Sequence, residues 1–126
     1  MSLVRIDLRK GKDEAYRKEI GRMIYHALVD SGAPRGERFQ IIAEHDDDNF
    51  LFDPDYLGVQ RSENLVIIQI TLNEGWSLER KQSLYKAIAD GLHYGAAIRR
   101  EDVLVSLVEV RKENWSFGNG VAQLLD

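Results

Sequence analysis

The sequence contains no cysteine, which excludes disulfide bonds, thiol nucleophiles and cysteine-based zinc sites. It has no apolar run near the roughly 20 residues that a bilayer-spanning helix requires. The net charge of −4 argues against a protein that binds nucleic acid by neutralising phosphates. The start of the chain, with Arg5, Asp7, Arg9 and Lys10, lacks the apolar segment of a signal peptide. These absences favour a cytoplasmic protein that binds neither membranes nor nucleic acid.

Motifs for metals and phosphates are missing as well. The histidines His26, His45 and His93 have no second ligand at metal-binding spacing. The acidic run 46–48 lacks the glycine and the final glutamate of a calcium loop, so we interpret it as a solvated loop tip. No Gly-x-Gly-x-x-Gly or Walker pattern occurs. We therefore expect no metal and no cofactor.

What the chain does contain is an internal repeat. Residues 3–8, Leu-Val-Arg-Ile-Asp-Leu, are matched by residues 65–70, Leu-Val-Ile-Ile-Gln-Ile. Each run is followed by a turn glycine, a helical stretch and a second apolar run, so one local fold is expected twice. From the helices onward the equivalent residues are 64 positions apart: Ile20 and Leu84, Ile24 and Ile88, Leu28 and Leu92, Arg35 and Arg99, Glu37 and Glu101, Phe39 and Val103, Ile41 and Val105.

The first unit shows both periodicities clearly. Alternating apolar side chains predict a half-buried strand over residues 3–8. Apolar residues from position 16 to 31 recur at helical spacing, with Asp13 as the N-cap and Gly32 as the stop. Residues 39–45 are predicted to form the second strand.

The second unit has the same order. Residues 65–72 form a more continuous apolar run, which indicates a strand at the centre of the sheet. Ser77 is the expected N-cap of the second helix, and residues 103–110 the last strand. The long connection 46–62 carries several large apolar residues and is therefore expected to pack down onto the protein.

These elements predict one α+β domain over residues 1–126. Its repeat halves are about 1–45 and 63–110, joined by the loop 46–62 and followed by a tail, 111–126. Two β-α-β units with right-handed crossovers give a four-stranded mixed sheet with both helices on one face. The other face would expose apolar side chains, so we expect a homo-oligomer.

Several short motifs support a family resemblance that covers nearly the whole chain. They are the opening run 3–8, Gly32-Ala33-Pro34, Arg38-Phe39-Gln40, Leu57-Gly58 with Arg61-Ser62, and above all residues 114–120, Asn-Trp-Ser-Phe-Gly-Asn-Gly. With these motifs the chain resembles the tautomerase superfamily, especially its longer, duplicated members related to malonate semialdehyde decarboxylase.

The resemblance implies a homotrimer with three sites and no cofactor. In the family an amino-terminal proline supplies a secondary amine, whose pKa falls among apolar walls and positive groups. Such an amine moves a proton between the oxygen and carbon of an enol, or acts as an acid in hydration or decarboxylation. Cationic side chains hold the substrate carboxylate.

The chain departs from the family pattern at three places. Ser2 stands at the position of the proline, and we hypothesise that Met-Ser-Leu is an expression leader that replaced Met-Pro-Leu, because the match resumes at Leu3. The sequence Asn73-Glu74-Gly75 stands where decarboxylase-like members carry Arg-Pro-Arg. Where simple tautomerases have an arginine after the turn glycine, this chain has Lys12 and Trp76.

Carried over residue by residue, the resemblance proposes Ser2 and Glu37 as catalytic positions. Glu37 matches an aspartate that orients water, although its equivalent Glu101 suggests a structural role instead. Arg38, Arg61 and Lys12 are candidate carboxylate ligands or merely solvated charges. The full set of predicted substrate-binding residues is Arg38, Arg61, Asn73, Trp115, Phe117 and Lys12, with the two aromatic residues forming an apolar wall.

Three functions follow from this set of residues. The first is tautomerisation of a small 2-oxo or 3-oxo carboxylate, which the missing arginine pair favours over decarboxylation. The second is a decarboxylase, hydratase or dehalogenase in which Glu37 activates water. The third is a non-catalytic trimer that binds a small acid or a protein partner.

Overall fold

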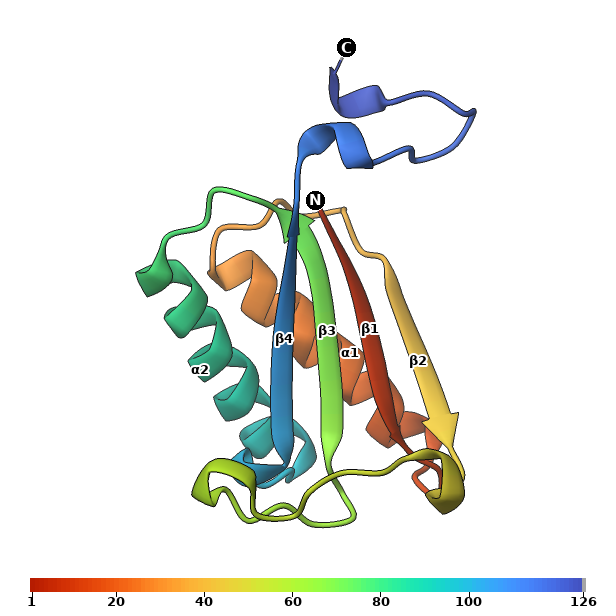
Figure 1. The fold of residues 1–126 in the computed structure, drawn as a ribbon, viewed down its shortest axis with the longest axis vertical. Helices are drawn as coiled ribbons and strands as arrows, with labels where there is room; N and C mark the ends of the chain where they lie inside the picture. The colour runs from red at the N-terminus through yellow and green to blue at the C-terminus, as the bar shows by residue number, and fades with distance from the viewer. Residues whose placement is uncertain (126) are drawn as a thin grey trace.

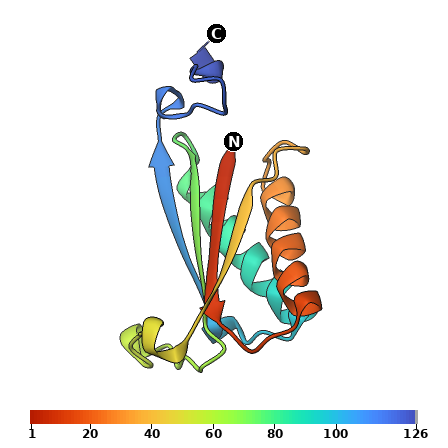
Figure 2. The same cartoon turned by 90° about the vertical axis from the view of Figure 1, so that its right-hand side faces the viewer.

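The computed structural model describes residues 1–125, in which a sheet of four strands is covered on one face by two α-helices (Figure 1). The predicted fold class is therefore confirmed. Seen from the side, both helices lie on the same side of the sheet, and the opposite face is uncovered (Figure 2). The elements are β1 (Ser2–Arg9), α1 (Glu14–Asp30), β2 (Gln40–His45), β3 (Val66–Asn73), α2 (Leu78–Ala96) and β4 (Val103–Val110).

The strand order β2-β1-β3-β4 places β1 and β3 at the centre, as predicted for β3. The strands within each unit are parallel, whereas β1 and β3 are antiparallel. Ser2 consequently lies opposite Leu72, so the first residues of β1 meet the last residues of β3. This junction brings the amino terminus beside the turn that leads into α2.

Both helices begin at the predicted residues, and α1 also ends where predicted. The side chain of Asp13 accepts a hydrogen bond from the backbone N–H of Tyr16, and Ser77 accepts one from Arg80. Helix α1 stops at Ser31, and Gly32 follows with a φ of 101°, a conformation that favours glycine.

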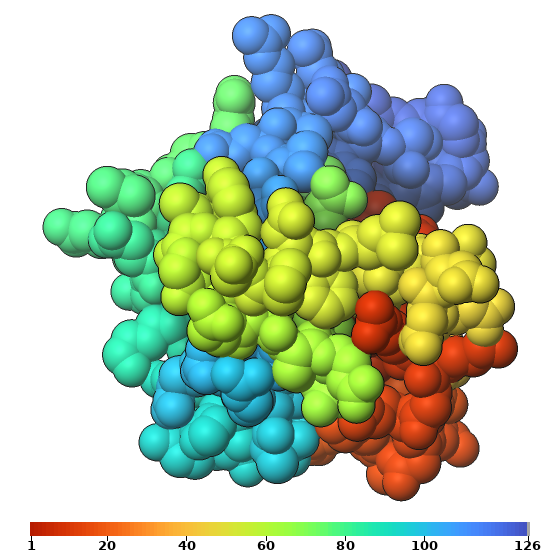
Figure 3. All heavy atoms as spheres, turned by 60° about the horizontal axis from the view of Figure 1, so that its bottom comes forward, coloured from red at the N-terminus to blue at the C-terminus, as the bar shows by residue number. Residues whose placement is uncertain are grey.

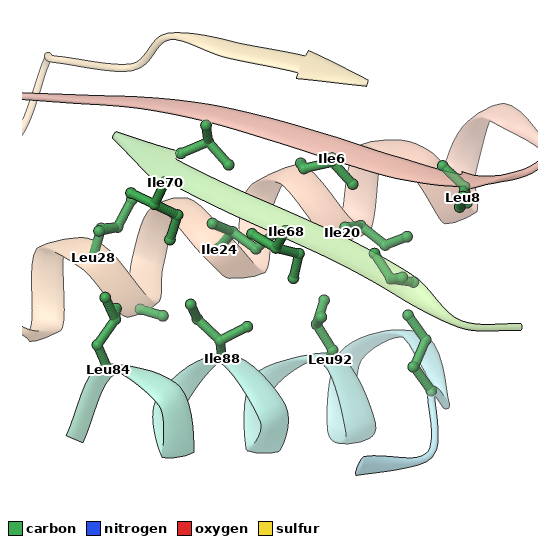
Figure 4. Close-up of a cluster of buried hydrophobic side chains, with 14 of the residues drawn as sticks. Ile6, Leu8, Ile20, Ile24, Leu28, Ile68, Ile70, Leu84, Ile88 and Leu92 are labelled. Atoms are coloured by element: carbon green, nitrogen blue, oxygen red, sulfur yellow. The ribbon is translucent and has the colours of Figure 1, made fainter. Parts of the chain in front are cut away.

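The core lies between the sheet and the helices, where apolar side chains of the two units meet (Figure 4). Ile24 of α1 faces Ile88 of α2, whereas Leu28 lies near Leu84 and Ile20 near Leu92, and all of these side chains are buried. Strand residues on the helix-facing side complete this layer: Val4, Ile6, Leu8, Val66, Ile68, Ile70 and Leu72.

The register of the repeat differs from the predicted one in the first strands. Residues 3–8 were expected to match 65–70, but β1 and β3 occupy 2–9 and 66–73, so their offset is also 64. Because side chains alternate with a period of two along a strand, a shift of two residues leaves the same side chains on each face. The sequence pattern alone could not distinguish the two alignments.

A second correction concerns the residues after the helices. The backbone N–H of Ala33 donates to the carbonyl of Leu28, and that of Ile98 donates to the equivalent Leu92. Ala33 and Ile98 are therefore equivalent, 65 positions apart. The extra residue arises because α2 is longer than α1 and has Ala97 as its C-cap, with a positive φ of 55°. The predicted pairs from Arg35/Arg99 onward are wrong by one residue.

The loop 46–62 packs down only in part. It lies across the lower strand ends, with its yellow atoms against the red atoms of the first turn (Figure 3). Phe50 is buried, as expected, but Leu51 and Leu57 are each 81% exposed, because the loop turns these side chains outward. At the other end of the sheet, the tail from Arg111 extends beyond β4, near the amino terminus (Figure 1).

Candidate active site

A small pocket of about 60 Å³ lies where the start of β1 meets the end of β3. The end of α1 and the first turn of α2 close its sides, and Val4, Leu28 and Leu72 give it an apolar floor. Its polar groups come from segments far apart in the sequence: Met1, Ser2, Tyr25, Glu37, Arg38, Gln40, Asn73 and Arg80.

Both predicted catalytic positions lie in this pocket. The amino-terminal nitrogen of Met1 lies 3.5 Å from Oε2 of Glu37, so the two groups form an ion pair. Ser2 is only 9% exposed, and its nitrogen is part of a peptide bond to Met1. The free amine of this chain is therefore held by a half-buried carboxylate at the pocket mouth.

Two arginines add positive charge to the pocket. Arg38, predicted from the sequence, is exposed; its Nε donates to Oε1 of Gln40 over 3.1 Å. Arg80, which sequence reasoning missed, donates from Nε to the carbonyl of Ser31 over 2.6 Å and lies 3.5 Å above the ring centre of Trp76. One signal could have found it: Arg80 is a cation in the first turn of a helix, where the dipole favours acidic residues.

Asn73 connects the pocket to the carboxy-terminal tail. Its Oδ1 accepts a hydrogen bond from Nε1 of Trp115 over 2.7 Å, and the ring of Trp115 stacks on Phe117 with centres 5.3 Å apart. The predicted aromatic residues thus lie beside the pocket and do not line it in this chain.

Lys12 and Arg61 lie at the opposite end of the sheet. Lys12 follows β1, with its Nζ 5.3 Å from the ring centre of Tyr16. Arg61 belongs to the loop 46–62, and its Nη1 donates to the carbonyl of Tyr56 over 3.0 Å. Of the predicted site residues, the chain therefore brings four together in the pocket: Ser2, Glu37, Arg38 and Asn73. Lys12 and Arg61 lie away from it.

The part of the chain from residue 1 to 125 contains no group of three or more His, Asp or Glu side chains that could hold a metal ion. Within the same residues, neither helix combines the length and the apolar composition that crossing a membrane requires. The charged groups among the described lining residues are one amine, one carboxylate and two guanidinium groups, and Tyr25 adds a phenol.

Comparison with known proteins gives consistent matches over the whole chain. A family model described as tautomerase enzyme matches residues 37–118, and a second of the same description matches residues 3–60. The protein named probable tautomerase YusQ, from Bacillus subtilis (strain 168), is 35% identical over 127 residues and is matched over 100% of both chains.

Solved structures agree with this result. A malonate semialdehyde decarboxylase, whose structures were described as a basis for its decarboxylase and hydratase activities, is 31% identical with a TM-score of 0.90, over 98% of this chain and 95% of that one. A fused 4-OT described as a symmetric trimer has the same fold, with 21% identity and a TM-score of 0.79 over 98% of both chains. With its two β-α-β units and these matches, the chain belongs to the tautomerase superfamily.

Proposed function

We propose that this protein is a cofactor-independent tautomerase that moves a proton on a small oxo-carboxylate through its amino-terminal amine. The observation that carries the proposal is the ion pair of the Met1 nitrogen with Glu37, inside a pocket that also holds Arg38 and Arg80. An amine beside a carboxylate can exchange a proton with a substrate, and the guanidinium groups attract an acid.

In this reaction the amine first gives up the proton that it carries in the ion pair with Glu37, and the neutral amine then takes the proton of an enol hydroxyl. The ammonium group then returns a proton to the neighbouring carbon, so the enol becomes a ketone and the amine is regenerated. Glu37 stabilises the ammonium form between these two steps and orients its N–H bonds. If Met1 is removed, the free amine passes to Ser2, which lines the same pocket.

The uncovered sheet face supports a homotrimer. Leu3 and Val108 on this face are each 37% exposed, and Ile41 is 49% exposed, so burying them would be favourable. Sedimentation velocity at micromolar concentration would test this directly, since a monomer would contradict the trimer.

A specific observation also favours a second activity, decarboxylation or hydration of a 3-oxo or unsaturated acid. The similarity to a malonate semialdehyde decarboxylase extends over 98% of this chain, which supports the proposal. Although Asn73-Glu74-Gly75 lacks arginine, Arg38 and Arg80 still give the pocket two cations. In the hydration reaction, Glu37 would act as the general base that orients the attacking water.

The first experiment is enol-to-keto conversion of phenylpyruvate. It compares the chain as printed with a Ser2→Pro variant whose lack of Met1 is verified by mass spectrometry. Activity in both forms would support the proposal for the chain as it stands. Activity in the proline form alone would show that the site is intact but that the amine of this chain does not catalyse the reaction. If both forms are inert while their oligomeric state is intact, enol tautomerase activity is absent, and a non-catalytic acid-binding protein becomes the better description.

A further inference from the structure

We propose that Arg80 binds the carboxylate of the substrate and that Trp76 holds its guanidinium group in place for this role. The inference rests on the proposed function, to which it adds a specificity-determining residue and a preference for anionic substrates. Neither residue was among the sequence-predicted ligands.

The Arg80 side chain is fixed from three directions. Its Nε donates to the carbonyl of Ser31, at the end of α1, and the guanidinium lies 3.5 Å above the centre of the Trp76 ring. A Cβ atom at Gly32 would lie 2.9 Å from Nη2 of Arg80, so the bare backbone of Gly32 admits the group. A guanidinium held in this way loses little further freedom when a ligand binds.

The same contacts leave most of its hydrogen-bonding capacity unused. A guanidinium group has five N–H donors, and within residues 1–125 that of Arg80 donates to one carbonyl and pairs with no carboxylate. By contrast, Arg22 and Arg100 each pair with an acidic neighbour, Glu19 and Asp90. The unused edge of Arg80 belongs to a half-buried side chain that lines the pocket, which suits a two-oxygen anion.

The internal repeat shows that this arrangement is particular to the second unit. The N-caps Asp13 and Ser77 are equivalent residues of the two units. Position 12 therefore corresponds to position 76, and position 16 to position 80. The first unit has the cation at 12 and the aromatic ring at 16, and Lys12 lies 5.3 Å from the centre of the Tyr16 ring. The second unit exchanges the two types, with Trp76 first and Arg80 one helical turn later.

The cation of the second unit is thus the planar guanidinium group of Arg80, on the first turn of α2, where the first unit has the flexible ammonium group of Lys12 before its helix. A cation there opposes the helix dipole, so the position is unfavourable for the helix itself. A bound carboxylate would offset that cost. Arg38, the other pocket guanidinium, is exposed and therefore more strongly screened by water.

The charge of the pocket agrees with an anionic ligand. Its only carboxylate, among the described lining residues, is Glu37, which is already paired with the Met1 nitrogen. Arg38 and Arg80 remain without an acidic partner, although the chain as a whole carries a net charge of −4. The site is therefore locally positive on an acidic protein.

The test compares phenylpyruvate with its methyl ester, which is neutral and larger by one methyl group, by calorimetric titration of the full chain. Arg80→Gln keeps a donor for the Ser31 carbonyl but removes the charge, and Arg80→Lys keeps the charge but removes the planar fork. Arg22→Gln, on the exposed face of α1, is the matched control. Thermal unfolding of each variant verifies that the fold is retained.

We expect Arg80→Gln to raise the Kd for phenylpyruvate by about tenfold or more, because a charge-assisted hydrogen-bonded pair is lost. The Kd for the ester should change less than about twofold, Arg80→Lys should lie between, and Arg22→Gln should bind as the unaltered chain does. Equal weakening for both ligands would mean a structural role and overturn the proposal. Unchanged phenylpyruvate binding in Arg80→Gln, or no binding by the unaltered chain, would overturn it as well.

These outcomes are separable from the failure of the proposed function. If binding depends on Arg80 but no proline form converts the enol, the carboxylate site stands and the tautomerase proposal fails. If turnover occurs with the same KM in Arg80→Gln, the tautomerase stands and the assignment of Arg80 fails.

Discussion

The amino-terminal nitrogen of Met1 lies 3.5 Å from Oε2 of Glu37. In the second unit, too, a carboxylate binds the segment that precedes the first strand. At the offset of 65, the counterpart of Glu37 is Asp102, which is fully buried. Its carboxylate accepts hydrogen bonds from the backbone N–H of Ser62 over 2.7 Å and from the hydroxyl of Ser62 over 2.6 Å. Each carboxylate thus holds the chain just before the first strand of its unit, and only in the first unit is the partner an amine.

Glu37→Gln should lower kcat for enol conversion by about tenfold or more in the active amino-terminal form, because the amide cannot stabilise an ammonium group as a carboxylate does. Steady-state kinetics of phenylpyruvate enol conversion provide the measurement. Glu101→Gln is the control, since Glu101 is exposed and pairs with Arg99. Equal rates in both variants would show that Glu37 takes no part in the tautomerase step. Its proposed role in activating water would then be the only one left.

Asp102→Ala should destabilise the protein by about 3 kcal/mol, because it leaves two donors of Ser62 without an acceptor. Ser62→Ala removes the hydroxyl, which donates to Asp102 and accepts from the backbone N–H of Asn64, and should cost about 1 kcal/mol. Urea unfolding monitored by circular dichroism gives both values. Asp48→Ala, at the exposed loop tip, should change the free energy of unfolding by less than about 0.5 kcal/mol; a comparable loss there would contradict the assignment.

Asn73→Ala should release the carboxy-terminal tail, because it removes the acceptor for Nε1 of Trp115. We expect a loss of about 1 kcal/mol and faster tryptic cleavage after Arg111 and Lys112. Mass spectrometry of timed digests measures the cleavage. Asn114→Ala, in the same tail, serves as the control, and similar digestion of the two variants would show that the Asn73 contact does not hold the tail.

Asp90 should contribute stability that depends on pH. Hydrogen bonds from Lys86 and then Arg100 lower the pKa of Asp90 below its ordinary value of 3.8. Because the folded pKa is the lower one, the contribution is complete above that ordinary value and is lost as the pH falls through the folded pKa.

The measurement is the Tm of the unaltered chain and of Asp90→Asn between pH 7 and about pH 2, a range that brackets the carboxyl titration. The unaltered chain should have the higher Tm at neutral pH, and the difference should shrink below about pH 4. Asp55→Asn, an exposed loop carboxylate, is the comparison. A Tm difference that persists unchanged to the lowest pH would show that the Asp90 charge is not its source.

Much of the fold follows from local patterns. The apolar spacing of α1, the cap at Asp13 and the stop at Gly32 depend on neighbouring residues only, and the structure confirms all three. The long loop shows the limit of such patterns: Phe50 is buried and Leu57 is exposed, although both are large apolar residues in the same segment. Composition does not encode which way a loop side chain turns.

The sequence by itself determined the duplicated β-α-β order and the helix-facing apolar residues, because these depend on short-range periodicity. The pocket positions Ser2, Glu37 and Arg38 came from the family resemblance that its motifs carry, and all three line the pocket. Only the tertiary structure decided that Lys12 and Arg61 lie at the far end of the sheet. It also decided that Arg80 enters the pocket. These placements depend on the antiparallel pairing of β1 with β3 and on the packing of α2 against the end of α1, which bring together residues far apart in the chain.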